Sequence, residues 1–323
     1  MWPLQRFQSE GVSELESPTE TPSNPELGFE HLDKLIKGSD APSTASRKTK
    51  AKLAWAVAYL TLLAIIFPAV LIVGHVTIQA LPHFKLSVLT TPTEGLAGGL
   101  KNEILGTLTI VVGILILAGT IGMLSGLYLS SYAPPRSGNL LRSASEILAG
   151  IPSIVFGYVG YLALAVHFHW GFSLGAGLIT LSIMVIPYIA KTTEVALRQV
   201  PSGYTEGGEA LGLSEGYILR RISLKSALPG ITTGLIVAIA IAIGETAPLL
   251  YTAGFSAGLP KLTITHSPLG YLTYAVWTFF NQPSKSAVQL SYDAAFLLIL
   301  GVVFLIVLAR VIVARTQRHS ENS

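Results

Sequence analysis

Long apolar runs separated by polar stretches dominate the chain from residue 53 onward. A helix needs roughly 20 mostly apolar residues to cross the hydrocarbon core of a bilayer. The runs are too long for strands and lack the alternation of a membrane barrel. The pattern therefore predicts six membrane-spanning helices, at residues 53–79, 105–130, 147–166, 172–190, 231–253 and 294–314.

Composition agrees with this pattern. Half of the 323 residues are hydrophobic, 12% are charged, and the mean hydropathy is +0.58. These values indicate an integral membrane protein, and the expected fold class is an all-α, polytopic membrane protein. The chain contains no cysteine, which excludes disulfides, thiolate catalysis and cysteine-based zinc sites.

The distribution of positive charge predicts the orientation. Cytoplasmic loops next to membrane spans carry an excess of lysine and arginine. If the N-terminus is inside, few of the 21 lysines and arginines fall in outer loops, namely Lys85, Lys101, Lys261 and Lys285. We therefore expect a multi-pass membrane protein with both termini in the cytoplasm.

The first 46 residues differ from the rest. They are rich in Ser, Thr, Pro and Glu and have too few large apolar groups to fold alone, so a disordered cytoplasmic tail at residues 1–46 is expected. The alternative is a short helix on the membrane surface, because Leu27, Leu32, Leu35 and Ile36 have roughly helical spacing. No apolar run precedes residue 53, which predicts an uncleaved first span and a transmembrane domain at residues 47–323.

Small residues and prolines mark two of the spans. Gly122 and Gly126 in the second span are spaced for close approach of a neighbouring helix. Pro152 in the third span and Pro187 in the fourth remove backbone donors, and kinks are expected there.

The connection at residues 191–229 is long and amphipathic, so we expect it to be structured. Ser202 is a predicted cap for a helix to Leu211, and Gly212 suits the left-handed residue that ends it. Ser214 is a predicted cap for a second helix, which runs to about Ser226. Pro229 and Gly230 then return the chain to the membrane.

This stretch resembles the EAA loop of ABC importer permeases. The residues that match the loop are Glu206, Gly207, Gly208, Gly212, Ile222 and Leu224. The resemblance implies a cytoplasmic coupling helix that fits a groove of an ATPase subunit. Glycines replace the two alanines, and Lys225 stands where proline is usual. The alternative from the residues alone is an amphipathic loop that lies on the membrane surface without a partner.

Three further segments resemble the PstA family, the permeases of phosphate-specific ABC importers. They are Gly244-Glu245-Thr246-Ala247-Pro248-Leu249-Leu250, Ala149 to Gly157, and Glu194 to Pro201. The resemblance implies a location in the cytoplasmic (inner) membrane of a bacterium. It also implies a complex with a second permease subunit (PstC-like), two ATP-binding subunits (PstB-like) and an extracytoplasmic phosphate-binding protein (PstS-like). The chain departs from the family at Ile241, because many of these permeases have an arginine one turn before the Gly-Glu-Thr motif.

Glu245 is an ionisable residue within an apolar span, which is expensive unless it faces a partner or a cavity. One hypothesis is that its carboxylate accepts a hydrogen bond from protonated phosphate, which sulfate lacks. The rival hypothesis is that it bonds helix ends or an arginine of a partner subunit. The predicted substrate path contains Glu245, Thr246, Pro248 and Ser153. The alternative for the hydroxyls of Thr246 and Ser153 is a hydrogen bond to the helix backbone.

The outer connection at residues 254–292 clusters aromatic residues, namely Tyr271, Tyr274, Trp277, Phe279 and Phe280. They predict either anchoring at the lipid headgroups or docking of a binding protein.

Two enzyme motifs are missing from the sequence, the P-loop and His-Glu-x-x-His. We therefore expect no catalytic residues and no cofactor, with ATP hydrolysed by a separate subunit. His167 and His169 have no carboxylate companion, so no metal site is predicted. The expected function is phosphate import. The alternatives are transport of sulfate, molybdate or a polyamine on the same fold, an ion-coupled carrier, or a membrane scaffold.

Overall fold

The computed structural model describes residues 44–321, which form helices and one short hairpin. The α-helices are α2 (Thr44–Ala80), α3 (Ser87–Thr90), α4 (Lys101–Ile114), α5 (Thr120–Ser131), α6 (Pro135–Gly150), α7 (Ser153–Gly160), α8 (Leu174–Arg198), α9 (Ser202–Ala210), α10 (Glu215–Ile218), α11 (Leu224–Gly244), α12 (Ala247–Thr252), α13 (Leu272–Phe280) and α14 (Lys285–Glu321). Wider π-helical turns extend three of them: η1 (Leu115–Gly119), η2 (Tyr161–His167) and η3 (Leu219–Ser223). The hairpin pairs β1 (Thr93–Glu94) antiparallel with β2 (Ala97–Gly98).

Internal contacts divide the chain at Pro68 into two units. The described part of the first unit, residues 44–68, is the beginning of α2, and its large side chains, such as Leu60 and Ile65, are exposed. The second unit holds the remaining helices. The predicted tail and the predicted surface helix within it lie outside the described residues up to residue 43, so both stay predictions.

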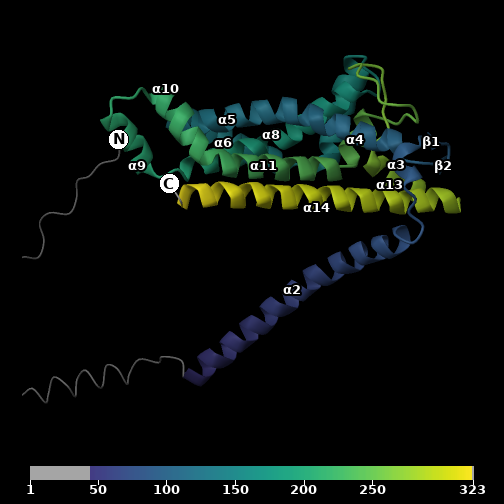
Figure 1. The fold of residues 1–323 in the computed structure, drawn as a ribbon, viewed down its shortest axis with the longest axis horizontal. Coiled ribbons are helices and arrows are strands. Elements are labelled where there is room, and N and C mark those ends of the chain that lie inside the picture. Colours follow the sequence, from purple (N-terminus) through teal and green to yellow (C-terminus); the bar gives the residue numbers. More distant parts are fainter. Residues whose placement is uncertain (1–43, 322–323) are drawn as a thin grey trace, which may run out of the picture. The chain divides into compact units, whose positions relative to one another are not determined.

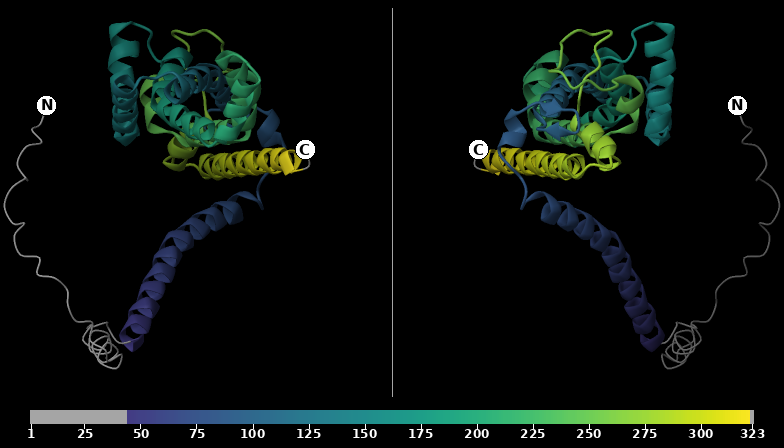
Figure 2. Two further views of the ribbon diagram at one scale, coloured as in Figure 1. Left: turned by 90° about the vertical axis from the view of Figure 1, so that its left-hand side faces the viewer. Right: turned by 90° about the vertical axis from the view of Figure 1, so that its right-hand side faces the viewer.

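Within the second unit, α4, α5, α6, α7, α11 and α12 pack on α8, and α14 packs on α11 and α13. Helix α5 lies along α8, and α11 contacts both α8 and α14. Figure 1 shows α9 and α10 at one end of this bundle and the hairpin, α3 and α13 at the other. The end views in Figure 2 show α14, in yellow, along one side. The core includes the fully buried Ile114, Leu181 and Ile189.

The glycines of the second predicted span allow α5 and α8 to approach closely. A Cβ atom on Gly126 would lie 2.5 Å from the carbonyl oxygen of Ala190, and one on Gly122 would lie 2.7 Å from Cβ of Ile189. The prediction that Gly122 and Gly126 receive a neighbouring helix is confirmed, and that neighbour is α8.

Five helical segments of the described chain are long and apolar enough to span a membrane, at residues 48–80, 101–131, 174–198, 215–244 and 285–314. The pair α6 and α7 makes a sixth if it counts as one span, but it is bent by 95°. The kink predicted at Pro152 in the third span is therefore confirmed, and the bend divides the predicted residues 147–166 between α6 and α7. Pro152 stands at the N-cap of α7, because proline fits the start of a helix better than its interior. Pro187, in contrast, lies inside the unbroken α8.

The helix of the fifth predicted span, residues 231–253, both begins and ends earlier in the structure, running from Glu215 to Gly244. The helix that starts with α10 continues through η3 into α11, so the prediction that it ends near Ser226 is wrong. Pro229 lies inside α11, where the Thr233 hydroxyl donates to its carbonyl oxygen over 2.8 Å. Gly230 packs against Ala196 of α8. Pro229 and Gly230, which are typical turn residues, therefore lie inside an unbroken helix at a point where α11 packs on α8.

The outer aromatic cluster separates into buried and exposed members. Tyr271 and Phe279 are buried, and burial raises the pKa of the Tyr271 phenol. Trp277 and Phe280 are more than half exposed. An interfacial or docking role is therefore restricted to the exposed pair, and the buried rings belong to the core.

Candidate functional site

Residues 202–223, here called the coupling element, form a helix, a turn and a second helix between α8 and α11 (Figure 1). Gly212 has a φ of +72°, the left-handed conformation predicted for it. The turn is closed by the backbone N–H of Leu213, which donates to the Gly208 carbonyl over 3.1 Å. Pro201 rather than Ser202 holds the N-cap position of α9, so the predicted Ser202 cap is wrong. Ser214 does stand at the N-cap of α10, but its side chain makes no capping bond.

The predicted coupling residues divide into an outward and an inward group. Glu206 and Gly207 are exposed on α9. Gly208 is buried, and a Cβ atom there would lie 2.9 Å from Cγ1 of Ile218 and 3.4 Å from Cδ1 of Ile222. Ile222 thus holds α9 against η3, whereas Leu224 packs on a core cluster of α8 and α11. The exposed members of the predicted coupling residues therefore lie on α9.

The Gly-Glu-Thr-Ala-Pro segment breaks the helix that it was predicted to continue. Helix α11 ends at Gly244, Glu245 is extended with φ −73° and ψ 129°, and Thr246 is the N-cap of α12. Pro248 favours the break, because a continuous helix would place its ring against the preceding turn, whereas a new first turn accepts proline. The Thr273 hydroxyl donates to the Glu245 carbonyl over 3.0 Å.

The broken helix packs against the other broken span. A Cβ atom on Gly157 of α7 would lie 2.9 Å from Cα of Pro248, which is itself fully buried. Ser153 begins α7, one turn before Gly157. The four predicted path residues therefore lie on two packed helical segments. Within residues 44–321, the half-buried carboxylate of Glu245 is in no ion pair of the structure.

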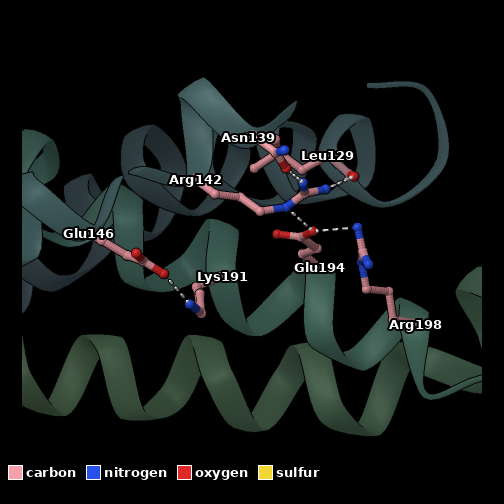
Figure 3. Close-up of polar contacts among 7 residues, drawn as sticks. All are labelled: Leu129, Asn139, Arg142, Glu146, Lys191, Glu194 and Arg198. Carbon is pink, nitrogen blue, oxygen red and sulfur yellow. Dashed lines mark hydrogen bonds and ion pairs between the residues drawn. The ribbon is translucent and has the colours of Figure 1, made fainter. Parts of the chain in front are cut away.

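A charged cluster joins α6 to α8 near the coupling element (Figure 3). The Nε of Arg142 donates to Oε1 of Glu194 over 2.8 Å, and Arg198 pairs with the same oxygen over 3.0 Å. Nearby, Lys191 pairs with Glu146 over 2.9 Å. These contacts were not predicted from the sequence. The available signal was Glu194, a carboxylate near the end of a helix that begins as an apolar span.

A second unpredicted cluster is buried at the opposite end of the bundle. The Thr93 hydroxyl lies 2.7 Å from both carboxylate oxygens of Glu103 and 2.6 Å from the Gly99 carbonyl oxygen. Asn102 accepts from the Thr93 backbone N–H and donates to the Ala257 carbonyl, both over 2.9 Å. These contacts tie the hairpin to the loop before α13. The sequence signal was Glu103, a carboxylate at the start of an apolar span.

Comparisons with known proteins identify the family. Residues 118–318 match the family described as "Binding-protein-dependent transport system inner membrane component". The phosphate transport system permease protein PstA 2 of Mycobacterium bovis is 54% identical over 266 residues, which are 82% of this chain and 88% of that protein. The chain belongs to the PstA permease family. A more distant PstA, from Yersinia pestis, is 30% identical over 287 residues, or 88% of this chain and 96% of that protein.

The fold agrees with this assignment. An inward-facing structure of the MetNI methionine ABC transporter matches with a TM-score of 0.52 and 19% identity, over 67% of this chain and 97% of that one. The chain therefore has the fold of ABC transporter permeases.

Proposed function

We propose that this chain is a permease subunit of an ATP-driven importer that carries inorganic phosphate across the cytoplasmic membrane. The observation that carries the proposal is the 54% identity to a protein named as a phosphate transport system permease, over 82% of the chain. In this proposal the chain is not itself an enzyme, and a separate subunit hydrolyses ATP.

The proposed partners are a second permease subunit (PstC-like), two ATP-binding subunits (PstB-like) and an extracytoplasmic phosphate-binding protein (PstS-like). The coupling element would fit the ATP-binding subunit through α9. The exposed Glu206 and Gly207 support this role, as does the packing of α9 through Gly208 against the second helix of the element. The inward Gly208, Ile222 and Leu224 would hold the element in place.

The proposed substrate path runs past the broken helices, at Ser153, Glu245, Thr246 and Pro248. Non-helical backbone at membrane depth is tolerated where it is buried or lines a water-filled cavity, so the break at Glu245 favours this position. The proposed location is the bacterial inner membrane with both termini in the cytoplasm, as the lysines and arginines indicate.

Accumulation of radiolabelled phosphate tests the proposal in a strain that lacks this chain and in the same strain with the chain restored. We expect uptake to return with the chain, to fall with a tenfold excess of arsenate, which resembles phosphate, and to resist a tenfold excess of sulfate. Uptake that sulfate suppresses equally would contradict phosphate selectivity. Uptake that is equal with and without the chain would contradict the proposal altogether.

A further inference from the structure

Arg142 contacts three helices through one guanidinium group (Figure 3). Its Nε donates to Glu194 of α8 over 2.8 Å, and its Nη2 donates to the Leu129 carbonyl of α5 over 3.1 Å. Its Nη1 donates to the Asn139 side chain of its own helix, α6, over 3.0 Å. The Glu194 carboxylate also receives Arg198. This set of contacts is here called the clamp.

The clamp is shielded and its geometry is fixed. The side chain of Glu194 is 6% exposed and that of Arg142 is 27% exposed. The Leu129 carbonyl is in the last turn of α5, where helix carbonyls lack intrahelical partners, so Arg142 satisfies it. Gly138 leaves space for the guanidinium, because a Cβ atom there would lie 3.2 Å from Nη1. The planar Arg142 guanidinium donates to three acceptors at fixed angles, so it resists sliding of α6 along α5 and α8.

The clamp lies between the coupling element and the helix break at Glu245. Glu194 lies in the last turns of α8, which leads directly into α9 of the coupling element. Arg142 lies on α6, which continues through the 95° bend into α7. Helix α7 packs on α12 at Gly157 and Pro248, next to the break at Glu245. Helix α11 joins the coupling element to the same break from the other side.

From this arrangement we propose that Arg142 and Glu194 are positioning residues for transport. The clamp makes α6 and α7 follow α8 when the coupling element moves, so both walls of the break at Glu245 shift together. Without the clamp, α11 still moves with the coupling element, because the two are continuous, whereas α7 no longer moves with them. ATP hydrolysis then continues with less substrate moved per ATP. This inference rests on the proposed function.

The second ion pair between α6 and α8 provides a matched control. Lys191 and Glu146 join the same two helices, but their side chains are 55% and 64% exposed. Exposed pairs contribute little, because solvent screens them and both side chains lose freedom. Glu146→Gln and Lys191→Gln should therefore leave the ratio of phosphate transported to ATP hydrolysed within about twofold of wild type.

The test uses the complete transporter in proteoliposomes, with radiolabelled phosphate uptake and ATP hydrolysis measured on the same preparation. For Arg142→Gln and for Glu194→Gln we expect the ratio of phosphate transported to ATP hydrolysed to fall about tenfold. The double variant should be impaired by less than the two single effects combined, because both changes remove the shared contact between Arg142 and Glu194. Arg142→Lys keeps the charge but loses the fork, so it should give an intermediate ratio.

A purely structural clamp would give a different result. Fewer complexes would then assemble, uptake and hydrolysis would fall in parallel, and the ratio would stay at the wild-type value, which overturns the inference. Should Arg142→Gln fail to assemble, the ratio of Arg142→Lys decides in the same way. A wild-type complex that hydrolyses ATP without moving phosphate would instead refute the proposed function, which separates the two failures.

Discussion

Glu245 was singled out by the sequence, but its backbone conformation was not predicted. An ionisable side chain within an apolar span is energetically unfavourable, which indicated a functional residue, and the Gly-Glu-Thr-Ala-Pro segment indicated a family. Neither signal predicted that the helix stops there. Pro248 favours the break, but Pro187 and Pro229 lie inside continuous helices, so proline alone does not predict it. The break also packs against Gly157 of a distant segment, a contact that the local pattern does not contain.

Replacement of Glu245 by glutamine tests whether the carboxylate contacts substrate. A carboxylate accepts a hydrogen bond from the O–H group of hydrogen phosphate, whereas the amide also offers an N–H donor to sulfate. We expect Glu245→Gln to reduce the preference for phosphate over sulfate by about tenfold, about 1.4 kcal/mol, in competition uptake measurements. Glu94→Gln, at an exposed carboxylate of the hairpin, should change nothing. Unchanged affinity and selectivity in Glu245→Gln would favour the rival role, a bond to helix ends or to a partner subunit.

At the scale of the elements, apolar run length predicted where helices lie, and long-range packing decided where they break. The second, fourth and sixth predicted spans correspond to residues 101–131, 174–198 and 285–314 of the structure. Proline gave opposite outcomes: Pro152 and Pro248 begin new helices, whereas Pro187 and Pro229 lie inside continuous ones. A local propensity does not distinguish these cases, because neighbouring helices supply the deciding contacts.

The contact between α5 and α8 should be intolerant of even one methyl group. A Cβ atom on Gly126 meets the Ala190 backbone, which cannot rotate away, so Gly126→Ala should destabilise the complex by about 1–3 kcal/mol. Gly301→Ala on α14 is the control, because nothing lies within 4 Å of its Cβ position and alanine favours a helix. Thermal unfolding of the purified complex measures both variants. Equal midpoints for Gly126→Ala and wild type would contradict the close packing.

At the scale of the whole molecule, the second unit separates two groups of elements along its length. The coupling element lies at one end, and the hairpin, α13 and the buried Glu103 cluster lie at the other (Figure 1). Charge along the sequence assigned the first end to the cytoplasm, and this assignment remains a prediction. The clamp and the Glu103 cluster were not predicted, since each joins residues from segments that only the fold brings together.

Accessibility of the coupling element tests the central claim most directly, because the chain has no cysteine of its own. Glu206→Cys on α9 should react with a membrane-impermeant maleimide in inside-out vesicles stripped of the ATP-binding subunit, and not in intact cells. Adding that subunit back should block the reaction. Leu262→Cys, at a side chain 82% exposed in the loop before α13, is the control and should react only from outside. Labelling of Glu206→Cys from outside, or labelling that the ATP-binding subunit leaves unchanged, would contradict the account.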